Sequence, residues 1–489
     1  MPCNQLADFL AILNDGDDLR RISAEVDPEY ELAAVVDVIS REAPAGGPAI
    51  LFESVRGSAI PVAANVLGTR RRSCRALGSD SFDEASERLV SALMPEVPES
   101  WAGALKLVPR ISQLGGLPPQ LVKTGACQQI VKLGSDVELS ELPIPVCWPG
   151  ETGPTITAGQ IHLLDRATGT RLMSRQRIQV LDERSLTIHW SEYDAAYHVF
   201  REYADAGQQA PLAIVLGGDA LLTYVADAPV PVGNDPLLLA GLLAGQGVDV
   251  VRGRTIEFGV PAEAEIVIEG YISPDDACDH LGASASDLGF LTEYRSLPTI
   301  HVTAITHRAN PVLPVVVPGR QPTEEHQFHK LTERLTLPFL RLVLPEVVDI
   351  NRPISGGASR TLFLSIDGRI PGSAQKVMDA AASLDALSGA KLIVVVDAEV
   401  DVQNEREVWA AVAANVAAQR DARITSRPGD YADPAGDAQG PASRLCIDAT
   451  RKSSPGAAWN GRFVAVPTAD QVERVLRRAS EFGFEQETA

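Results

Sequence analysis

The chain has little positive charge for its length. Lys and Arg number 43 against 64 Asp and Glu in 489 residues, a formal net charge of −21. Nucleic acids and anionic membranes attract concentrated basic surfaces, so this balance argues against both partners. Aromatic residues make up only 5% of the chain, too few to favour a base-stacking platform. The composition instead predicts a large acidic soluble protein that acts on small molecules.

Long hydrophobic runs and paired cysteines are also missing. The apolar run at 236–245 is too short to span a bilayer, and the N-terminus lacks the basic start of a signal peptide. The six cysteines are scattered, without any C-x-x-C pair. We therefore expect free thiols in a reducing cytoplasm and no zinc site.

The common catalytic motifs are absent as well. There is no G-x-x-x-x-G-K-[ST] phosphate loop, no H-E-x-x-H and no G-x-S-x-G elbow. His326 and His329 lie three apart on a predicted helix, and we interpret them as a solvated pair rather than metal ligands.

Hydrophobic periodicity divides the chain into three predicted domains. Residues 1–110 read as a mixed α/β module, and 111–320 are rich in short β-branched runs typical of an antiparallel barrel or sandwich. Residues 321–489 alternate strand and helix, which indicates an α/β layer with parallel pairing. A last amphipathic helix at 468–482 either packs on that layer or reaches a neighbouring subunit.

The region 142–190 carries the most chemical information. Arg175 stands between apolar neighbours on a predicted strand, where alternation could turn it inward. A buried guanidinium must meet an anion, because an unpaired one would be very costly. Two interpretations remain open, a structural pair with a carboxylate and an anion-binding residue of an active site.

Several segments together resemble the UbiD family of prenylated-FMN-dependent decarboxylases. They are LPIPVCWPGETGPTITAG, SRQ at 174–176, VPAEAEIVIEGYI, KLIVVVDAEVD and LCIDATRK, in the family's order. The resemblance implies a split β-barrel flavin-binding domain, a linking helix and a C-terminal α/β oligomerisation domain. It also implies prenylated FMN supplied by a partner flavin prenyltransferase, and a cytoplasmic homodimer or homohexamer. The implied reaction is non-oxidative (de)carboxylation of an aromatic or α,β-unsaturated carboxylic acid.

The resemblance also assigns residues. Arg175 would orient the substrate carboxylate and contact the flavin, and the cofactor positions fall on Thr170, Met173, Arg175, Gln176 and Arg444. The family's three metal ligands fall on Thr170, Tyr193 and Pro236, with Asp235 beside the last. These side chains do not form the cage that a divalent ion prefers. The metal ligands therefore remain unknown, and binding of Mn²⁺ or Mg²⁺ and of K⁺ stays open.

The acid loop departs from the family too. Anchored on Gly289 and Phe290, its two acid positions fall on Leu281 and Ser286. Slippage by one residue would offer His280 and Asp287, and His280 is a competent acid/base near neutral pH. The alternative is a polar loop that has simply lost its acids.

Arginines around this strand could compensate for the lost metal. Arg171 and Arg177 flank Arg175, and arginines bind phosphate without a metal, so Arg171, Arg177 and Arg444 form a hypothetical phosphate site. The leading hypothesis is a UbiD-like (de)carboxylase in which Arg175, His280 and Asp287 are catalytic. The alternatives are a catalytically degenerate paralogue that serves as a binding or assembly subunit, and a changed reaction on the same flavin.

Overall fold

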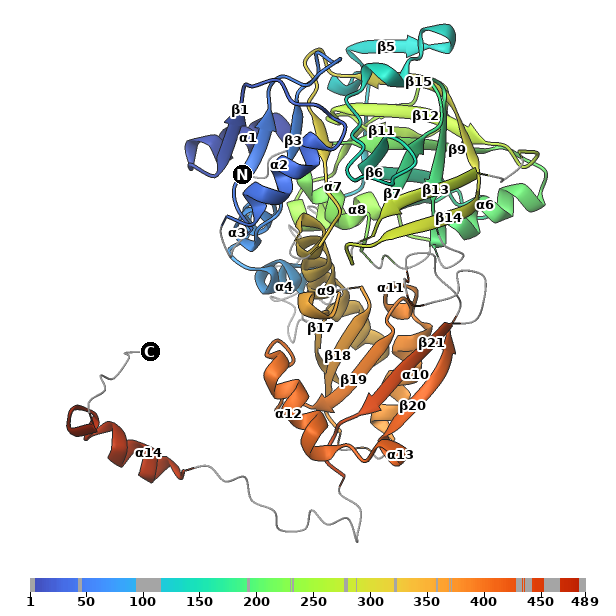
Figure 1. Ribbon diagram of the computed structural model, residues 1–489. Coiled ribbons are helices and arrows are strands. Elements are labelled where there is room, and N and C mark those ends of the chain that lie inside the picture. The colour runs from blue at the N-terminus through green and yellow to red at the C-terminus, as the bar shows by residue number, and fades with distance from the viewer. Residues whose placement is uncertain are drawn as a thin grey trace, which may run out of the picture.

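The structure is a computed structural model. It describes residues 5–42, 46–93, 116–190, 194–228, 230, 233–276, 280–286, 288–320, 323–357, 359–368, 370, 372–427, 433, 435, 442–452 and 467–482. Figure 1 shows an upper body, which holds the N-terminal module and a barrel, above a smaller C-terminal domain, with a long helix between them.

The N-terminal module is a small mixed sheet with helices around it. Its strands follow the order β1-β2-β3-β16, and β16 pairs in parallel with β3 although it comes from the segment after the barrel. The first helix begins at Leu6, and its apolar side packs Phe9 and Leu13 into the core. The elements are α1 (Leu6–Asp15), β1 (Leu19–Ile22), α2 (Glu31–Ser40), β2 (Ala49–Phe52), β3 (Val62–Ala64), α3 (Arg70–Ala76), α4 (Phe82–Leu93) and β16 (Leu313–Val315).

The central domain is a closed antiparallel barrel. Six strands pair in the order β12-β9-β6-β7-β8-β15, and β15 pairs back with β12 to close the ring. Isoleucine, leucine and valine side chains of alternate positions fill its interior. The strands are β6 (Thr155–Leu164), β7 (Arg171–Val180), β8 (Ser185–His189), β9 (Ala210–Leu216), β12 (Ile266–Ile272) and β15 (Thr299–His307), with β5 (Ile130–Leu133) added to β15.

Several smaller elements cover the outside of the barrel. A three-stranded sheet, β11-β10-β4, packs against β9 and β12, and the hairpin β13–β14 follows β12. The elements are β4 (Gln120–Val122), α6 (Ala195–Asp205), α7 (Ala220–Val225), α8 (Pro236–Ala244), β10 (Asp249–Arg252), β11 (Gly259–Pro261), β13 (His280–Ala285), β14 (Leu291–Leu297) and the short 3-10 turns η1 (Ala126–Gln128), η2 (Gly134–Asp136) and η3 (Leu139–Glu141).

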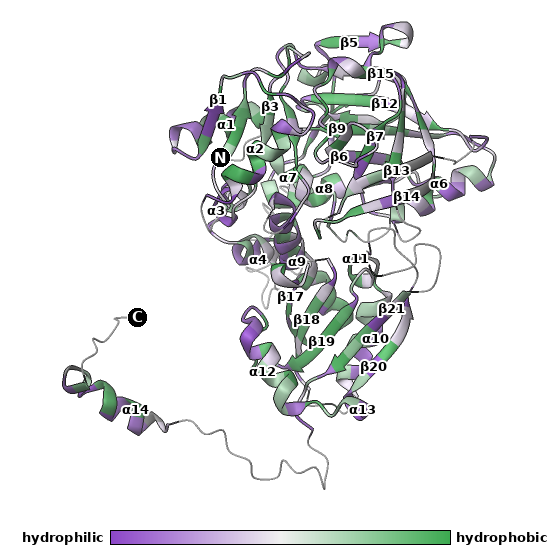
Figure 2. Cartoon of the chain, in the orientation of Figure 1, coloured by the Kyte–Doolittle hydropathy of each residue, from purple (hydrophilic) through white to green (hydrophobic). Residues whose placement is uncertain are grey.

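The long helix α9 (Glu324–Val343) joins the barrel to the C-terminal domain (Figure 1). That domain has a five-stranded sheet of order β17-β18-β19-β21-β20, in which β18, β19 and β21 run parallel. Figure 2 shows its central strands β18 and β19 as strongly hydrophobic. Both faces of these strands are buried, one under α10 and the other under α12, and this explains their continuous apolar runs.

The remaining elements complete this domain. They are β17 (Val347–Asn351), η4 (Ile354–Gly356), β18 (Thr361–Ile366), α10 (Ser373–Ser383), α11 (Asp385–Ser388), β19 (Leu392–Asp397), α12 (Glu405–Asn415), α13 (Ala418–Asp421), β20 (Ala422–Arg427), β21 (Ala442–Asp448), α14 (Ala469–Leu476) and η5 (Ala479–Phe482). Helix α14 stands apart from the sheet in Figure 1 rather than packing on it.

The predicted fold class is confirmed, with a barrel followed by an α/β layer. No helix of the described residues is long and apolar enough to cross a membrane. Of the six expected thiols, Cys74, Cys127, Cys147 and Cys446 are free and buried, and Cys3 and Cys278 lie outside the described residues.

Candidate active site

Strand β7 presents one continuous polar face to the outside of the barrel. The inner positions Leu172 and Ile178 belong to the barrel core, so Arg171, Arg175 and Arg177 share the opposite face with the buried Met173. The register shift between β6 and β7 lies on β6, at Ile156/Gly159, so the alternation along β7 is unbroken. The strand therefore turns Arg175 out of the barrel and not inward.

Arg175 lies in a buried cluster of charge. Its Nη2 is 2.7 Å from Oδ2 of Asp227, and its Nη1 is 3.6 Å from Oε1 of Glu325. The guanidinium carbon also lies 4.6 Å from the centroid of the Phe328 ring, a favourable cation–π distance. Glu325 is shared, because Nη2 of Arg177 lies 2.9 Å from its Oε2. The side chain of Arg175 is only 8% exposed, so this pairing takes place largely away from water.

The two carboxylates of the cluster respond differently to it. Burial raises the pKa of Asp227, and its pair with Arg175 only partly opposes that rise. Burial would also raise the pKa of Glu325, but Arg177 and Arg175 together lower it below the usual value. Asp227 is therefore the carboxyl of the cluster that takes up a proton more readily.

Adjacent carboxylates on α9 have opposite surroundings. Glu325 faces two arginines, whereas Glu324 accepts a 2.6 Å hydrogen bond from the backbone N–H of Leu67. Burial raises the pKa of Glu324 to about 7, and that hydrogen bond and the more distant Arg72 only partly oppose the rise. The helix thus places one ionised and one proton-binding carboxyl side by side in the chain.

Arg171 has a separate set of partners at the start of β7. Its Nε lies 3.3 Å from Oδ2 of Asp235, and its Nη1 lies 2.9 Å from Nδ1 of His162. Burial and the arginine hold the pKa of His162 well below its usual value, so a neutral imidazole accepts this bond. The guanidinium also lies over Phe258, at 5.7 Å from the ring centroid. Oδ1 of Asp235 accepts from the backbone N–H of Leu237 and so caps α8.

Two buried polar atoms of strand β6, beside these arginines, have no hydrogen-bond partner. Gln160 pairs with Arg175 in the register and His162 with Met173. Both side chains are buried, and Oε1 of Gln160 and Nε2 of His162 have no hydrogen-bond partner. One acceptor and one donor are thus left for a ligand with a polar edge, as a flavin ring has. These two unpartnered atoms fit the polar edge of a flavin.

A metal ion does not fit the same place. No group of three or more His, Cys, Asp or Glu that could hold a metal occurs within the described ranges. The carboxylate of Asp235 is already engaged by Arg171 and by the end of α8. Thr170 and Pro236 offer no such ligand set, and Tyr193 lies outside the described residues.

Models of known protein families match three consecutive parts of the chain. They are the N-terminal domain (residues 10–89), the Rift-related domain (residues 120–321) and the C-terminal domain (residues 326–449) of 3-octaprenyl-4-hydroxybenzoate carboxy-lyase, UbiD. An uncharacterized protein of Aquifex aeolicus is 37% identical over 447 residues, 91% of this chain and 92% of its own. The chain belongs to the UbiD family.

Solved structures of UbiD-class enzymes have the same architecture. An evolved dimeric form of HmfF from Pelotomaculum thermopropionicum, in complex with prFMN, is 27% identical, with a TM-score of 0.74 over 96% of this chain and 98% of that one. Vanillic acid decarboxylase of Sedimentibacter hydroxybenzoicus in closed form shares the fold with a TM-score of 0.86 at 24% identity, over 98% of this chain and 99% of that one. At the level of the family, the chain has the flavin-binding fold of carboxy-lyases of the UbiD type.

Hairpin β13–β14, where the resemblance predicts the acid loop, reaches the same outer face of β7. In hairpin β13–β14, Ser284 lies with its Oγ 3.4 Å from Nδ1 of His189, which is paired across the strands with Arg177. Ser286 is buried and Leu281 follows His280 at the start of β13. Asp287 lies outside the described residues, and the side chain of His280 is not described, so the catalytic roles of both stay predictions.

The other predicted cofactor residues are spread over two domains. Gln176 lies on the face of β7 opposite Arg175, with its Nε2 2.7 Å from Oγ of Ser174. Arg444 lies on β21 of the C-terminal domain, where its guanidinium donates to the backbone oxygens of Ala390, Ala382 and Ser388. In this conformation Arg444 braces its own domain, and its role at the cofactor stays a prediction.

The expectation for the two histidines of α9 needs correction. His326 is fully buried, and its Nδ1 takes part in the cap of α9 with the backbone N–H and the hydroxyl of Thr323. Burial likewise holds the pKa of His329 well below the usual value. The interpretation of a solvated histidine pair is therefore wrong, because α9 packs on several sides and buries residues that an isolated helix would expose.

Sequence reasoning missed Asp227 and Glu325. Asp227 follows α7 in a turn, and Glu325 lies in the acidic first turn of α9, where carboxylates are common for helical reasons alone. Only the tertiary structure brings both to Arg175. The one available signal was the requirement that a buried arginine meet an anion.

Proposed function

We propose that this protein is a (de)carboxylase that acts on an aromatic or α,β-unsaturated carboxylic acid with prenylated FMN. The observation that carries the proposal is the position of Arg175, which lies on the barrel face beside two buried polar atoms without partners and between two carboxylates. Family membership supports the reaction class. The cofactor would come from a flavin prenyltransferase, and the homodimer or homohexamer stays a prediction.

Arg175 is the proposed anchor for the substrate carboxylate. Its planar guanidinium can bind a carboxylate through two parallel hydrogen bonds, and Asp227 now occupies one side of it. A substrate carboxylate would compete with Asp227 for these donors. Glu325 and the Phe328 ring would keep the guanidinium in place during that exchange.

Asp227 is the proposed proton carrier, in place of the acids that the loop lacks. Burial already raises its pKa, and a substrate carboxylate on Arg175 would raise it further by adding negative charge nearby. A protonated Asp227 could then deliver its proton to the carbon that loses CO₂, and solvent would reprotonate the carboxylate. His280 and Asp287 remain proposed alternatives for this step.

The proposed cofactor site uses residues of β6 and β7. Prenylated FMN, when bound, supplies the electron sink for the carbanion character that is left as CO₂ departs. Gln160, His162 and Met173 would hold it, with Thr170 and Gln176 nearby in the chain. Because a metal cage does not fit, we propose that the fixed positive charge of Arg171 serves the phosphate, with Arg177 and Arg444 as further candidates.

Cofactor loading and turnover test this proposal together. The chain is co-produced with a flavin prenyltransferase, purified, and examined by absorbance and by the mass of the bound cofactor. We expect a bound prenylated flavin that survives dialysis against a chelator, and CO₂ release from members of a panel of aromatic and α,β-unsaturated acids. Absence of bound cofactor under every condition would overturn the proposed enzymatic activity. Cofactor loading that requires stoichiometric divalent metal would overturn the proposed binding of the phosphate by Arg171.

Two substitutions and a control test the proposed roles of Arg175 and Asp227. Arg175→Ala should abolish turnover, and Asp227→Asn should lower kcat by about a hundredfold with a smaller effect on KM, as expected for loss of a general acid. The exposed Arg406→Ala on α12 is the matched control and should leave turnover unchanged. Full activity in Asp227→Asn would transfer the proton step to another group.

A binding or assembly subunit without catalysis is the second candidate. The pairing of Arg175 with Asp227 and Glu325 favours it, because carboxylates of the chain itself satisfy the guanidinium. On this alternative the protein binds no flavin or binds it without turnover, and Arg175→Ala affects stability only. CO₂ release that depends on Arg175 would exclude it.

A further inference from the structure

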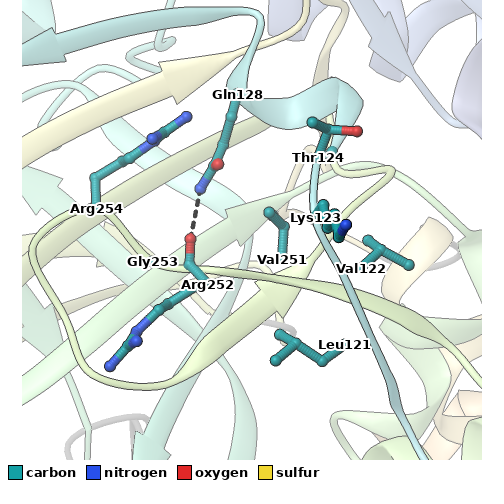
Figure 3. Close-up of a pocket in the computed structure, with 10 residues that line it drawn as sticks. Leu121, Val122, Lys123, Thr124, Gln128, Val251, Arg252, Gly253 and Arg254 are labelled. Atoms are coloured by element: carbon teal, nitrogen blue, oxygen red, sulfur yellow. Dashed lines mark hydrogen bonds between the residues drawn. The ribbon is translucent and has the colours of Figure 1, made fainter.

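A concave surface lies on the small sheet outside the barrel. It is a groove of about 450 Å³ between the segment Leu121–Gly125, which begins in β4, and the turn Val251–Arg254, which begins in β10. Figure 3 shows Arg252 and Arg254 on the turn and Lys123 on the facing segment. The volume is that of a small-molecule site.

The groove is lined by basic and neutral residues without an acidic one. Lys123, Arg252 and Arg254 are exposed, and none has an ion pair or side-chain hydrogen bond with any residue in the described part of the chain. The protein has a net charge of −21, so three cations without ion-pair partners around one groove make a locally positive surface on an acidic protein. Exposed cations without partners that line one groove attract an anion.

The backbone around the groove is held in place. Nε2 of Gln128 donates to the backbone oxygen of Arg252 at 2.8 Å (Figure 3). The buried Glu269 accepts from the backbone N–H groups of Arg254 and Thr255 at 2.8 and 2.6 Å. This carboxylate is therefore used to brace the turn, and the arginine side chains beyond it stay free for a ligand.

The walls of the groove add an apolar component. Leu121 is largely exposed, and Val250 is its partner where β4 and β10 pair, whereas Val251 pairs with Val122 and is buried. Val251 is continuous with the apolar cluster that fixes the small sheet to the barrel. A ligand would thus meet cations at the rim and aliphatic side chains at the wall.

We propose that this groove binds a small organic phosphate, with the phosphate between Lys123 and the two arginines and the apolar part against Leu121. Two guanidinium groups and an ammonium suit a dianionic phosphate better than a singly charged carboxylate. The groove shares no residue with the Arg175 cluster, which β7, the turn after α7 and α9 provide. The proposal stands whether or not the protein is a decarboxylase.

Calorimetric titration of the purified full-length chain tests it. The probes are phenyl phosphate, inorganic phosphate and benzoate, at low salt. We expect phenyl phosphate to bind most tightly, inorganic phosphate more weakly, and benzoate at least about tenfold more weakly than phenyl phosphate. Raised salt should weaken the phosphate complexes steeply.

The triple variant Lys123→Gln, Arg252→Gln, Arg254→Gln locates the site. It should bind phenyl phosphate at least about tenfold more weakly, while Arg406→Gln, an exposed arginine of the C-terminal domain, should bind it as the wild type does. The substituted side chains are exposed, and unchanged circular dichroism would verify the fold. Undetectable phosphate binding, binding that survives the triple substitution, or benzoate binding as tight as that of phenyl phosphate would each overturn the proposal.

Discussion

Arginines in two regions of this protein have opposite surroundings. Arg175 and Arg177 are largely buried on the barrel face and share Glu325 of α9, and Arg175 also pairs with Asp227 from the turn after α7. Arg252 and Arg254 are exposed on a turn and have no carboxylate partner among the described residues. A buried arginine needs a carboxylate partner, because a desolvated charge is costly. Water can solvate the exposed Arg252 and Arg254 instead. A buried pair can thus be structural, and exposed unpaired cations are free for a ligand.

Removal of the buried cation should have the largest effect. Arg175→Met leaves Asp227 and Glu325 without their shared partner, so we expect a loss of about 3–5 kcal/mol in the free energy of unfolding. Urea denaturation measures it. The double variant Arg175→Met, Asp227→Leu should recover part of the loss, because it removes the stranded charge as well. A loss below about 1 kcal/mol would mean that water already screens the charges of the cluster, and would contradict the need of a buried arginine for a partner.

Glu324 offers a buried charge with no arginine in direct contact. Its pKa is raised from 4.5 to about 7 by burial, so the folded state binds more protons than the unfolded one between these values. Stability should therefore fall as the pH rises from about 4.5 to 7, by up to about 3 kcal/mol. Glu324→Gln should flatten this dependence and stabilise the protein at pH 8 by a similar amount.

The neighbouring Glu325→Gln is the matched control for this pH dependence. Arginines lower the pKa of Glu325, so loss of its charge should destabilise the protein at pH 8. Chemical denaturation across pH 4–8 distinguishes the two variants. Equal effects of the two substitutions would contradict the assignment of opposite surroundings on α9.

Arg171 should be intermediate between the buried cluster and the exposed turn. Arg171→Leu removes the partner of Asp235 and His162 and the contact with Phe258, so we expect a loss of about 2 kcal/mol. Thermal unfolding measures it. Arg171→Lys should recover only part, because an ammonium cannot reproduce both contacts with one planar group. Full recovery would reduce the role of Arg171 to its charge alone.

The exposed cations should have the smallest effect on folding. The triple variant Lys123→Gln, Arg252→Gln, Arg254→Gln should change the free energy of unfolding by less than about 0.5 kcal/mol, since it breaks no internal pair. Urea denaturation without phosphate checks this. A larger loss would mean that these charges stabilise the fold. The exposed cations would then resemble Arg175 in their contribution to stability.

Much of the fold could be predicted from local pattern. Alternating β-branched runs predicted the strands of the barrel, and apolar runs between helices predicted β18 and β19. Hairpin β13–β14 and strand β16 were missed. The first contains small and polar residues with weak strand preference, and the second is only three residues long and pairs with β3 across some 250 residues of chain.

The sequence by itself determined the elements, the order of the domains, the family resemblance and the need of Arg175 for an anion. Which anion it meets was decided by the tertiary structure, since Asp227 lies 52 residues away in the chain and Glu325 belongs to a helix beyond the barrel. The same holds for the basic groove, whose two sides come from β4 and β10. Periodicity reports the neighbours of a residue along its own strand or helix, but pairing between distant elements depends on how the whole chain packs.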